Sequence, residues 1–257
     1  MRKILVRLTL FLLLLGACCA GWVYRTQIGA LVEGLLESPA APDPAPDPEN
    51  YSVLSADLEE HRKRLGRDYL RTTSETERTE ILAQARELLE LSLPRLMRCW
   101  LGTPWDFNGT AHEPGAGKVA CGYFVSSVLQ DAGFRVEWAP LAQQASQNIL
   151  GTFLPSDDMN IRVGTGYEQF LSEIIAHGKG VYIVGLDSHV AFLLITGEGE
   201  IRFIHSSGAS PYCVVEESRE EAQVLRRSNY RVTGNLTANR ELIRNWLLGT
   251  KFKTRKL

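Results

Sequence analysis

The sequence lacks any excess of positive charge. Its 257 residues include 28 Lys and Arg against 30 Asp and Glu, a formal net charge of −2. No basic stripe is interleaved with aromatic side chains, so we expect no nucleic-acid partner. The only basic cluster, within 251–256, lies at the C-terminus, where it predicts solvated surface. An apolar fraction of 44% with 23% charged residues is typical of a globular chain, which allows an enzyme without requiring one.

A long apolar run occurs near the N-terminus. Three basic residues precede the run Leu8–Leu15 and small residues follow it, which predicts a signal peptide over residues 1–17. The sequence Leu15-Gly16-Ala17-Cys18 resembles the lipobox of bacterial lipoproteins, in which the cysteine, here Cys18, is lipidated. The alternative is an uncleaved anchor from Leu8 to about Tyr24. Either predicts an extracytoplasmic protein of the periplasm or cell envelope, tethered to the membrane.

The segment after the apolar run is rich in proline. Five prolines between Ser38 and Asn50 favour an extended conformation, and we expect a linker over residues 18–50. Residues 51–97 carry apolar side chains at helical spacing among charged ones, and Ser74 precedes Glu77 in a capping pattern. They predict a helical arm packed on the main domain, with wall or partner binding as an alternative role.

A cysteine at the predicted start of a helix is the first candidate for chemistry. Apolar pairs at i, i+4 predict a helix from Cys121 to Ala132, and Gly133 supplies its C-terminal stop. Unsatisfied backbone N–H groups in a first turn favour the thiolate, so we expect the pKa of Cys121 to lie below its ordinary value of about 8.5. Taken alone, a free cysteine is more often a small buried apolar residue.

Two histidines give this cysteine a possible base. His189 begins one apolar run, His205 ends the next, and Gly197 lies midway between them. A hairpin folded about Gly197, with a loop of about three to five residues, places His189 directly across from His205 on one face of the sheet. A thiol, a base and a group that orients the base are what a cysteine nucleophile needs.

Four short segments, taken in order, resemble the NlpC-type cell-wall peptidases, a branch of the papain-like cysteine peptidases. They are Gly102-Thr-Pro-Trp105, Cys121-Gly-Tyr-Phe-Val125, His189-Val-Ala-Phe192 and Phe203-Ile-His-Ser-Ser207. The resemblance covers roughly residues 95–215. It implies an α+β, papain-like (NlpC-type) domain over residues 98–257, with the nucleophile at a helix N-terminus packed on an antiparallel sheet and the helical arm before it.

The resemblance also implies roles for single residues. Cys121 is the nucleophile, His189 the general base, His205 the group that holds the imidazole in its productive tautomer, and Trp105 a candidate oxyanion donor through its indole N–H. No cofactor and no metal are implied. The implied reaction is cleavage of amide bonds in peptidoglycan stem peptides through an acyl-enzyme, with the stem peptide and the membrane as partners.

The chain departs from the family pattern beside the nucleophile. The family usually has Asp and Ser where this chain has Ala120 and Gly122, and Tyr where it has Trp105. The alternatives are therefore an amidase or acyltransferase of the same fold acting on another substrate, or an inert wall-binding module. A zinc site of Cys121, His189 and His205 is a further alternative, although no fourth ligand is evident.

The remaining expectations concern structure around this site. Cys99 and Cys213 form either a disulfide or two unpaired thiols. Residues 140–166 form part of the cleft wall, and Asp187 belongs to a connection between strands. We expect surface positions for the other histidines and for the paired acidic residues. Helices are predicted at about 167–176 and 238–248, and an antiparallel sheet from about 181 to 216.

Overall fold

Two long helices begin the part of the chain that the computed structural model describes, residues 44–256. They are α2 (Pro48–Arg71) and α3 (Glu75–Arg98). Asp47 caps α2 by accepting a hydrogen bond from the N–H of Asn50 at 3.0 Å, and Pro48 occupies the first turn, where its missing donor is harmless. The helix therefore begins within the predicted linker, whose end at residue 50 lies too late. The predicted signal peptide and the lipidated Cys18 lie outside the described residues.

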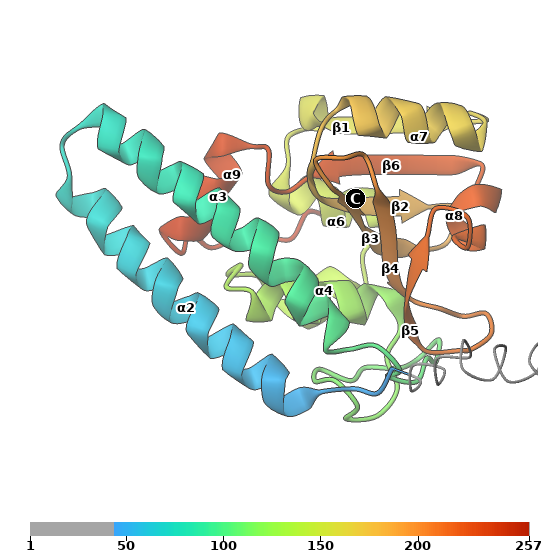
Figure 1. The fold of residues 1–257 in the computed structure, drawn as a ribbon. Coiled ribbons are helices and arrows are strands. Elements are labelled where there is room, and N and C mark those ends of the chain that lie inside the picture. Colours follow the sequence, from blue (N-terminus) through green and yellow to red (C-terminus); the bar gives the residue numbers. More distant parts are fainter. Residues whose placement is uncertain (1–43, 257) are drawn as a thin grey trace, which may run out of the picture. The chain divides into compact units, whose positions relative to one another are not determined.

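The α2–α3 hairpin is part of the main core. Ser74 caps α3 as predicted, through a 3.3 Å hydrogen bond from the N–H of Glu77. Leu89, Leu93 and Leu96 of α3 are fully buried in the same apolar cluster as the central sheet. Residues Pro44–Leu257 form one compact unit, so the predicted arm and the segment after it fold together (Figure 1).

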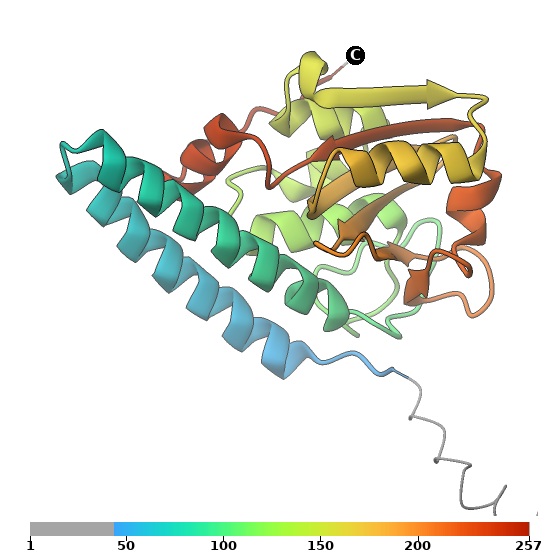
Figure 2. The same cartoon turned by 45° about the horizontal axis from the view of Figure 1, so that its top comes forward.

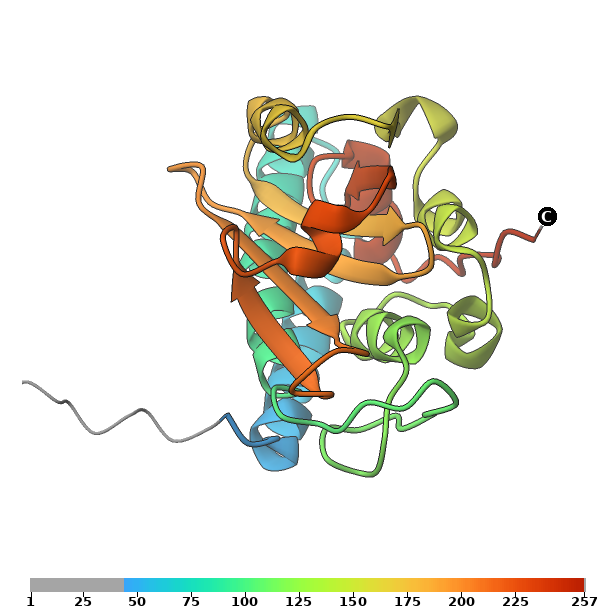
Figure 3. The same ribbon diagram turned by 90° about the vertical axis from the view of Figure 1, so that its right-hand side faces the viewer.

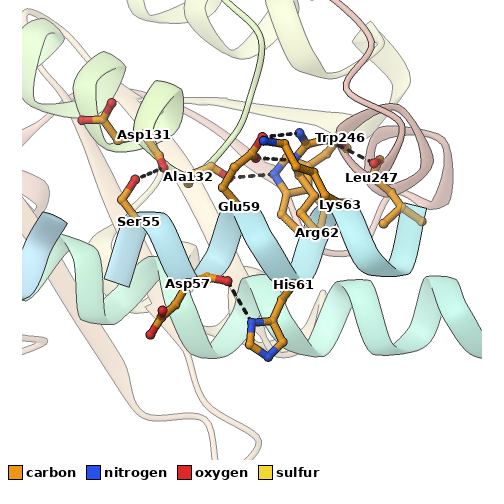
Figure 4. A network of polar contacts seen from close by, with 10 residues as sticks. All are labelled: Ser55, Asp57, Glu59, His61, Arg62, Lys63, Asp131, Ala132, Trp246 and Leu247. Atoms are coloured by element: carbon orange, nitrogen blue, oxygen red, sulfur yellow. Dashed lines mark hydrogen bonds and ion pairs between the residues drawn. The ribbon is translucent and has the colours of Figure 1, made fainter. Parts of the chain in front are cut away.

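A buried arginine ties α2 to the C-terminal helix α9 (Arg240–Leu247). Arg62 donates to the backbone carbonyls of Trp246 and Leu247, each at 3.1 Å, and forms two hydrogen bonds with Glu59 (Figure 4). These carbonyls belong to the last turn of α9, where the carbonyl of Trp246 also accepts from the N–H of Gly249 at 3.0 Å and further donors are needed to satisfy the helix end. The guanidinium therefore caps α9 and fixes the arm to the body of the protein. The predicted helix at 238–248 is confirmed as α9, with slightly shorter bounds.

The central sheet has six strands, and every neighbouring pair among them is antiparallel. Their order across the sheet is β1-β6-β2-β3-β4-β5. The strands are β1 (Met159–Val163), β2 (Gly180–Leu186), β3 (Val190–Ile195), β4 (Ile201–Ser206), β5 (Val214–Ser218) and β6 (Tyr230–Asn235). The predicted sheet is confirmed in β2 to β5. It continues beyond β2 through β6 and β1, which the prediction missed.

Helices cover both faces of the sheet, which makes the protein α+β. Alternate residues of β2 divide between two apolar clusters, with Ile183 on one face and Val184 on the other. One face packs against α3, α4 (Cys121–Asp131), α6 (Ser146–Phe153) and α9, and the other against α7 (Tyr167–Ala176) and α8 (Gln223–Arg227). Figure 2 shows α7 lying along the sheet, and Figure 3 shows α4 (green) across the strands from it. Two short elements, α5 (Trp138–Ala142) and a 3₁₀ turn (Ser156–Asp158), complete the described part.

The predicted helix at 167–176 is confirmed as α7. Its inward residues Phe170, Leu171 and Ile174 are buried. Among residues 44–256, no helix is long and apolar enough to cross a membrane.

Candidate active site

Helix α4 begins at Cys121, as the apolar spacing predicts. Ala120 precedes it and makes no side-chain capping hydrogen bond, so the N-cap residue satisfies none of the first-turn N–H groups. Gly133 follows the helix with a φ of +90°, a conformation that glycine adopts without strain. The cysteine therefore stands at the N-terminal end of a helix that packs on the sheet, with Phe124 against Phe192 of β3 at 5.8 Å between ring centroids.

Glycine at position 122 is a packing requirement. A Cβ atom built there would lie 2.2 Å from the carbonyl oxygen of Ala142 at the end of α5. Serine, which the resembled family usually carries at this position, would make the same backbone clash. Gly122 therefore differs from the serine of the resembled family at a position where the end of α5 comes close to α4. Ala142 and the residues after it form one wall of the cavity beside Cys121.

The pKa of Cys121 moves in the direction opposite to the prediction. Burial raises it above the ordinary cysteine value, and hydrogen bonding from the backbone N–H groups of Val190, Gly122 and Cys121 itself opposes this only in part. The helix terminus favours the thiolate, but the free-energy cost of removing a charged sulfur from water is larger here and favours the thiol. At neutral pH the resting sulfur is a thiol.

The β3–β4 hairpin is folded about residue 198, one position after the predicted centre. Ile195 pairs with Ile201 and Phe192 with Ile204, and the loop carries Gly199 at φ +79°. A three-residue hairpin loop needs its last residue in the left-handed region, and Gly199 supplies it. The prediction that His189 lies directly across from His205 is therefore wrong, because the register moves the two histidines to diagonal positions.

The two histidines nevertheless share a face and contact each other. Nε2 of His189 lies 2.9 Å from Nδ1 of His205, and their rings meet edge to face. Diagonal neighbours on one face of an antiparallel pair lie within reach of long and aromatic side chains. The observed register moves the pairing partner of each residue by two positions from the predicted one. Because side chains alternate with a period of two, both histidines stay on the same face of the sheet and remain in contact.

A glutamate extends this contact to the next strand. Nε2 of His205 lies 3.2 Å from Oε2 of Glu217 on β5, and His205 is completely buried whereas Glu217 is partly exposed. Because Phe203 pairs with Glu217 and His205 with Val215, this link is diagonal too. Glu217, one of the paired acidic residues expected at the surface, instead contacts buried His205, so that prediction is wrong. The alternation of β5 would have put it on the histidine face, but the pairing of β4 with β5 is not specified by any short turn motif.

The row of three side chains fixes which nitrogen carries each proton. A carboxylate only accepts hydrogen bonds, so Nε2 of His205 donates to Glu217, and in the tautomer that carries this single N–H the Nδ1 atom of His205 accepts. His189 then donates from Nε2 to His205, and its own Nδ1 is left without a proton. Burial, followed by the neighbouring His205, lowers the pKa of His189 to about 3. At neutral pH, His189 is thus an uncharged imidazole with one unprotonated ring nitrogen.

Cys121 lies near the point where the pairing of β3 with β4 ends. The pairing of these strands is not continued at Val190, whose N–H interacts instead with the Cys121 sulfur. At the end of β4, the hydroxyl of Ser206 donates to the carbonyl of Val119 at 2.7 Å. Cys121 and His189 line one cavity of about 470 Å³. No hydrogen bond joins these two side chains within the described residues, and catalytic hydrogen bonds often tighten only when substrate is bound.

The walls of this cavity come from three segments. The α5–α6 connection contributes Gln144, and the first turn of α6 contributes Ser146 and Gln147. The β2–β3 turn contributes Asp187 and Ser188, and Tyr230 begins β6. Of the predicted wall at residues 140–166, only residues between 142 and 147 line this cavity. A Cβ at Gly185 would lie 2.3 Å from the Ser146 hydroxyl oxygen, so a second glycine permits this wall to close on the sheet.

Trp105 lies outside this cavity. Its backbone N–H donates to the carbonyl of Tyr212 at 2.8 Å, its ring lies 6.4 Å from that of Tyr212, and Gly208 packs against it. The structure therefore brings Cys121, His189 and His205 together and leaves Trp105 in the neighbouring loop layer. An oxyanion donor must come from elsewhere in the site.

The other candidate residues have structural positions. Cys99 is a buried free thiol, so the disulfide alternative with Cys213 is not realised. His61 and His177 are exposed, each with a ring nitrogen near a carbonyl of its own helix. His112 is half-buried, contrary to expectation, beside Gln130 and the ring of Trp138. Among residues 44–256, no group of three or more His, Cys, Asp or Glu side chains is placed to hold a metal ion.

Comparisons with protein-family models, with curated proteins and with solved structures find no match to this chain. The family resemblance therefore depends on the four sequence segments alone.

Proposed function

We propose that the protein is a cysteine hydrolase that cleaves amide bonds through an acyl-enzyme, on a papain-like arrangement of helix and sheet. The observation that carries this proposal is the row His189–His205–Glu217 together with the position of His189 and Cys121 in the lining of one cavity. A neutral base beside a buried thiol, with two further groups that orient the base, is the arrangement that nucleophilic catalysis requires.

The reaction begins from an uncharged pair. As the sulfur of Cys121 attacks the carbonyl carbon, its proton passes to Nδ1 of His189, and the imidazolium that forms is stabilised through His205 by the Glu217 carboxylate. The tetrahedral adduct collapses, the C–N bond breaks, and the amine leaves with the proton from His189. Water then gives a proton to His189 as it attacks the thioester, and the proton returns to the sulfur when the carboxylic acid is released.

The oxyanion is stabilised by backbone donors. The first turn of α4 presents the N–H of Cys121 and the N–H of Gly122 without a side-chain cap. Backbone N–H groups at a helix terminus favour negative charge and need no reorganisation during the reaction. This assignment replaces the indole of Trp105, which lies outside the cavity.

We propose peptidoglycan stem peptides as the substrate and an extracytoplasmic, membrane-tethered location. The four-segment resemblance supports the substrate, and the apolar run with its lipobox-like sequence ending at Cys18 supports the location. The neutral amide and hydroxyl side chains of Gln144, Gln147 and Ser188 in the cavity suit a peptide, whose backbone offers both donors and acceptors.

The second candidate is an inert wall-binding module. Ala120 and Gly122, where the resembled family carries Asp and Ser, favour it. Against it stands the position of His189, since a binding module has no need of an imidazole that is oriented by buried His205 and, through it, by Glu217.

A thiol-directed activity probe distinguishes the two. An electrophilic peptide probe should label Cys121 rapidly in the wild type and at least about 100-fold more slowly in His189→Gln, because general-base assistance contributes about 10²–10⁴-fold. His177→Gln, which changes an exposed histidine, is the matched control and should label like the wild type. Equal slow labelling of all three proteins would establish the inert module and end the proposal.

A further inference from the structure

The cavity beside Cys121 is nearly devoid of charge. Of the described residues that line it, Cys121 is a thiol and His189 a neutral imidazole at pH 7, and the remainder are apolar, amide or hydroxyl side chains, with one exception. Asp187, two residues before His189, is the only one with a formal charge. No lysine or arginine of residues 44–256 lines the cavity.

The carboxylate of Asp187 is held in a fixed orientation. Its Oδ2 accepts from the hydroxyl of Ser228 and from the N–H of Asn229, both at 2.7 Å, and its Oδ1 accepts from the N–H of Tyr230 at 3.0 Å. These donors lower its pKa, the Ser228 hydroxyl most. The side chain is exposed, and an ionised carboxylate offers about four lone-pair positions, of which three are occupied here.

No cation within the described residues neutralises this carboxylate directly. The charge of Arg231 also lowers the pKa of Asp187, but less than the hydrogen-bond donors do, and this arginine is 1% exposed. Its guanidinium donates instead to the backbone carbonyls of Leu225, Thr165 and Arg226. The cavity thus presents one oriented negative charge toward solvent, next to the candidate base.

We propose that Asp187 forms a subsite for a cationic group of the substrate, an ammonium close to the scissile amide. Since nothing in the cavity compensates a negatively charged ligand, the same carboxylate disfavours a substrate carboxylate at this position. The inference depends on the proposed function only in taking the substrate to be a peptide. It narrows the substrate class to peptides with a free amine near the bond that is cut.

Binding to an inactive variant tests the subsite apart from catalysis. We would titrate Cys121→Ala with a lysine-containing stem tetrapeptide and with three twins acetylated at the α-amine, at the lysine Nζ, or at both. At low salt, one of the single acetylations should weaken binding about 3- to 10-fold, as expected for a partly exposed ion pair. The difference should shrink at 300 mM salt.

Three protein variants on the Cys121→Ala background assign the effect. Asp187→Asn should abolish the preference for the free amine. Asp157→Asn makes the same charge change in the 3₁₀ turn outside the cavity and should leave the preference intact. Ser228→Ala removes a hydrogen bond from Asp187 and keeps its charge, so it should also retain the preference, which separates charge from the shape of the turn even if Asp187→Asn is destabilised.

Equal binding of the free and doubly acetylated peptides would overturn the subsite, and so would the absence of binding by any of the four at millimolar concentration. Neither result decides the proposed function, because labelling of Cys121 by the activity probe is measured separately. Failure of labelling with a retained amine preference would end the hydrolase proposal and leave a cation-selective peptide-binding cavity.

Discussion

Nε2 of His189 lies 2.9 Å from Nδ1 of His205, although the β3–β4 register, extended to His189 just before β3, gives the two residues diagonal and not opposite positions. The same diagonal step joins His205 to Glu217 on β5. The three side chains therefore form one row that runs from the start of β3 through β4 to β5. In our account this row leaves Nδ1 of His189 unprotonated. His189 and Cys121 line the same cavity.

Glu217 is a positioning residue, and its removal tests the row. Glu217→Gln replaces an acceptor by an amide that also donates, which permits the opposite tautomer of His205 and then of His189. We expect kcat/KM for a cleavable peptide to fall about 10- to 100-fold, mainly in kcat, as part of the contribution of general acid–base catalysis. Nitrogen chemical shifts of the two imidazoles should report the altered proton positions.

The matched control is Glu216→Gln in the same strand. Glu216 pairs with Arg98 through two hydrogen bonds and lies on the opposite side of the strand from Glu217. The Glu216→Gln variant should retain the wild-type kcat and the wild-type imidazole nitrogen chemical shifts. If Glu217→Gln also retained both, the proton arrangement would not depend on the glutamate.

The thiol of Cys121 should alkylate as an uncharged group. Because burial raises its pKa and His189 is neutral, the rate with iodoacetamide should climb with pH until above the usual cysteine value of about 8.5. The measurement is the pH dependence of the alkylation rate from pH 5 to 10, with labelling at Cys121 verified by mass spectrometry. A fast plateau that extends down to pH 5 would reveal a resting thiolate–imidazolium pair and refute the uncharged starting state.

Acid should destabilise the fold through His189. Its pKa is lowered to about 3 in the folded protein from an ordinary value of 6.5, so the unfolded chain binds more protons between these values. The free energy of unfolding therefore rises with pH across this window and falls as the solution is acidified, by at most about 2 kcal/mol between pH 7 and 5 for this half-buried ring. Urea titrations at several pH values measure it.

A variant without the imidazole isolates this contribution. His189→Gln should have a flatter dependence of unfolding free energy on pH below about 6.5 than the wild type, whereas the exposed His61→Gln should follow the wild type. Identical curves for all three proteins would mean that His189 keeps an ordinary pKa in the folded state.

Introducing at position 122 the serine that is usual in the resembled family should harm the protein. Gly122→Ser places a Cβ 2.2 Å from the carbonyl oxygen of Ala142, a backbone contact that no side-chain rotation relieves. We expect a loss of about 1–3 kcal/mol in unfolding free energy, typical of overpacking, together with slower probe labelling of Cys121 as the α5–α6 connection is displaced. Gly166→Ser, where a Cβ meets nothing within 4 Å, is the control; equal stability of the two variants would show that the clash is absorbed.

Local patterns in the sequence were enough to predict much of this site. The helix starting at Cys121, the helix α7 and the common face of His189 and His205 follow from apolar periodicity, and all three are confirmed. The register of the hairpin does not follow from symmetry about Gly197, because Gly199 is the residue that takes the left-handed conformation. That choice depends on the turn type, which two glycines in one loop leave undetermined.

Features that depend on distant segments were not predictable. Glu217 meets His205 through the pairing of β4 with β5, and Trp105 lies beside Tyr212 because two loops pack together. The raised pKa of Cys121 is likewise a property of burial by the whole fold, which a helix-terminus argument omits. Each of these errors arises where tertiary packing decides the environment of a residue that local sequence only places on an element.

The most direct test of the account is digestion of purified cell-wall sacculi by the protein, with released fragments identified by mass spectrometry. Wild-type protein should release stem-peptide fragments with a new amine and a new carboxyl terminus, and Cys121→Ala, which removes only the sulfur, should release none. Intact-protein spectra during turnover should carry a peptide acyl adduct on Cys121. Absence of new fragments with sacculi of every peptide chemotype, or their release by Cys121→Ala at the wild-type rate, would contradict the account.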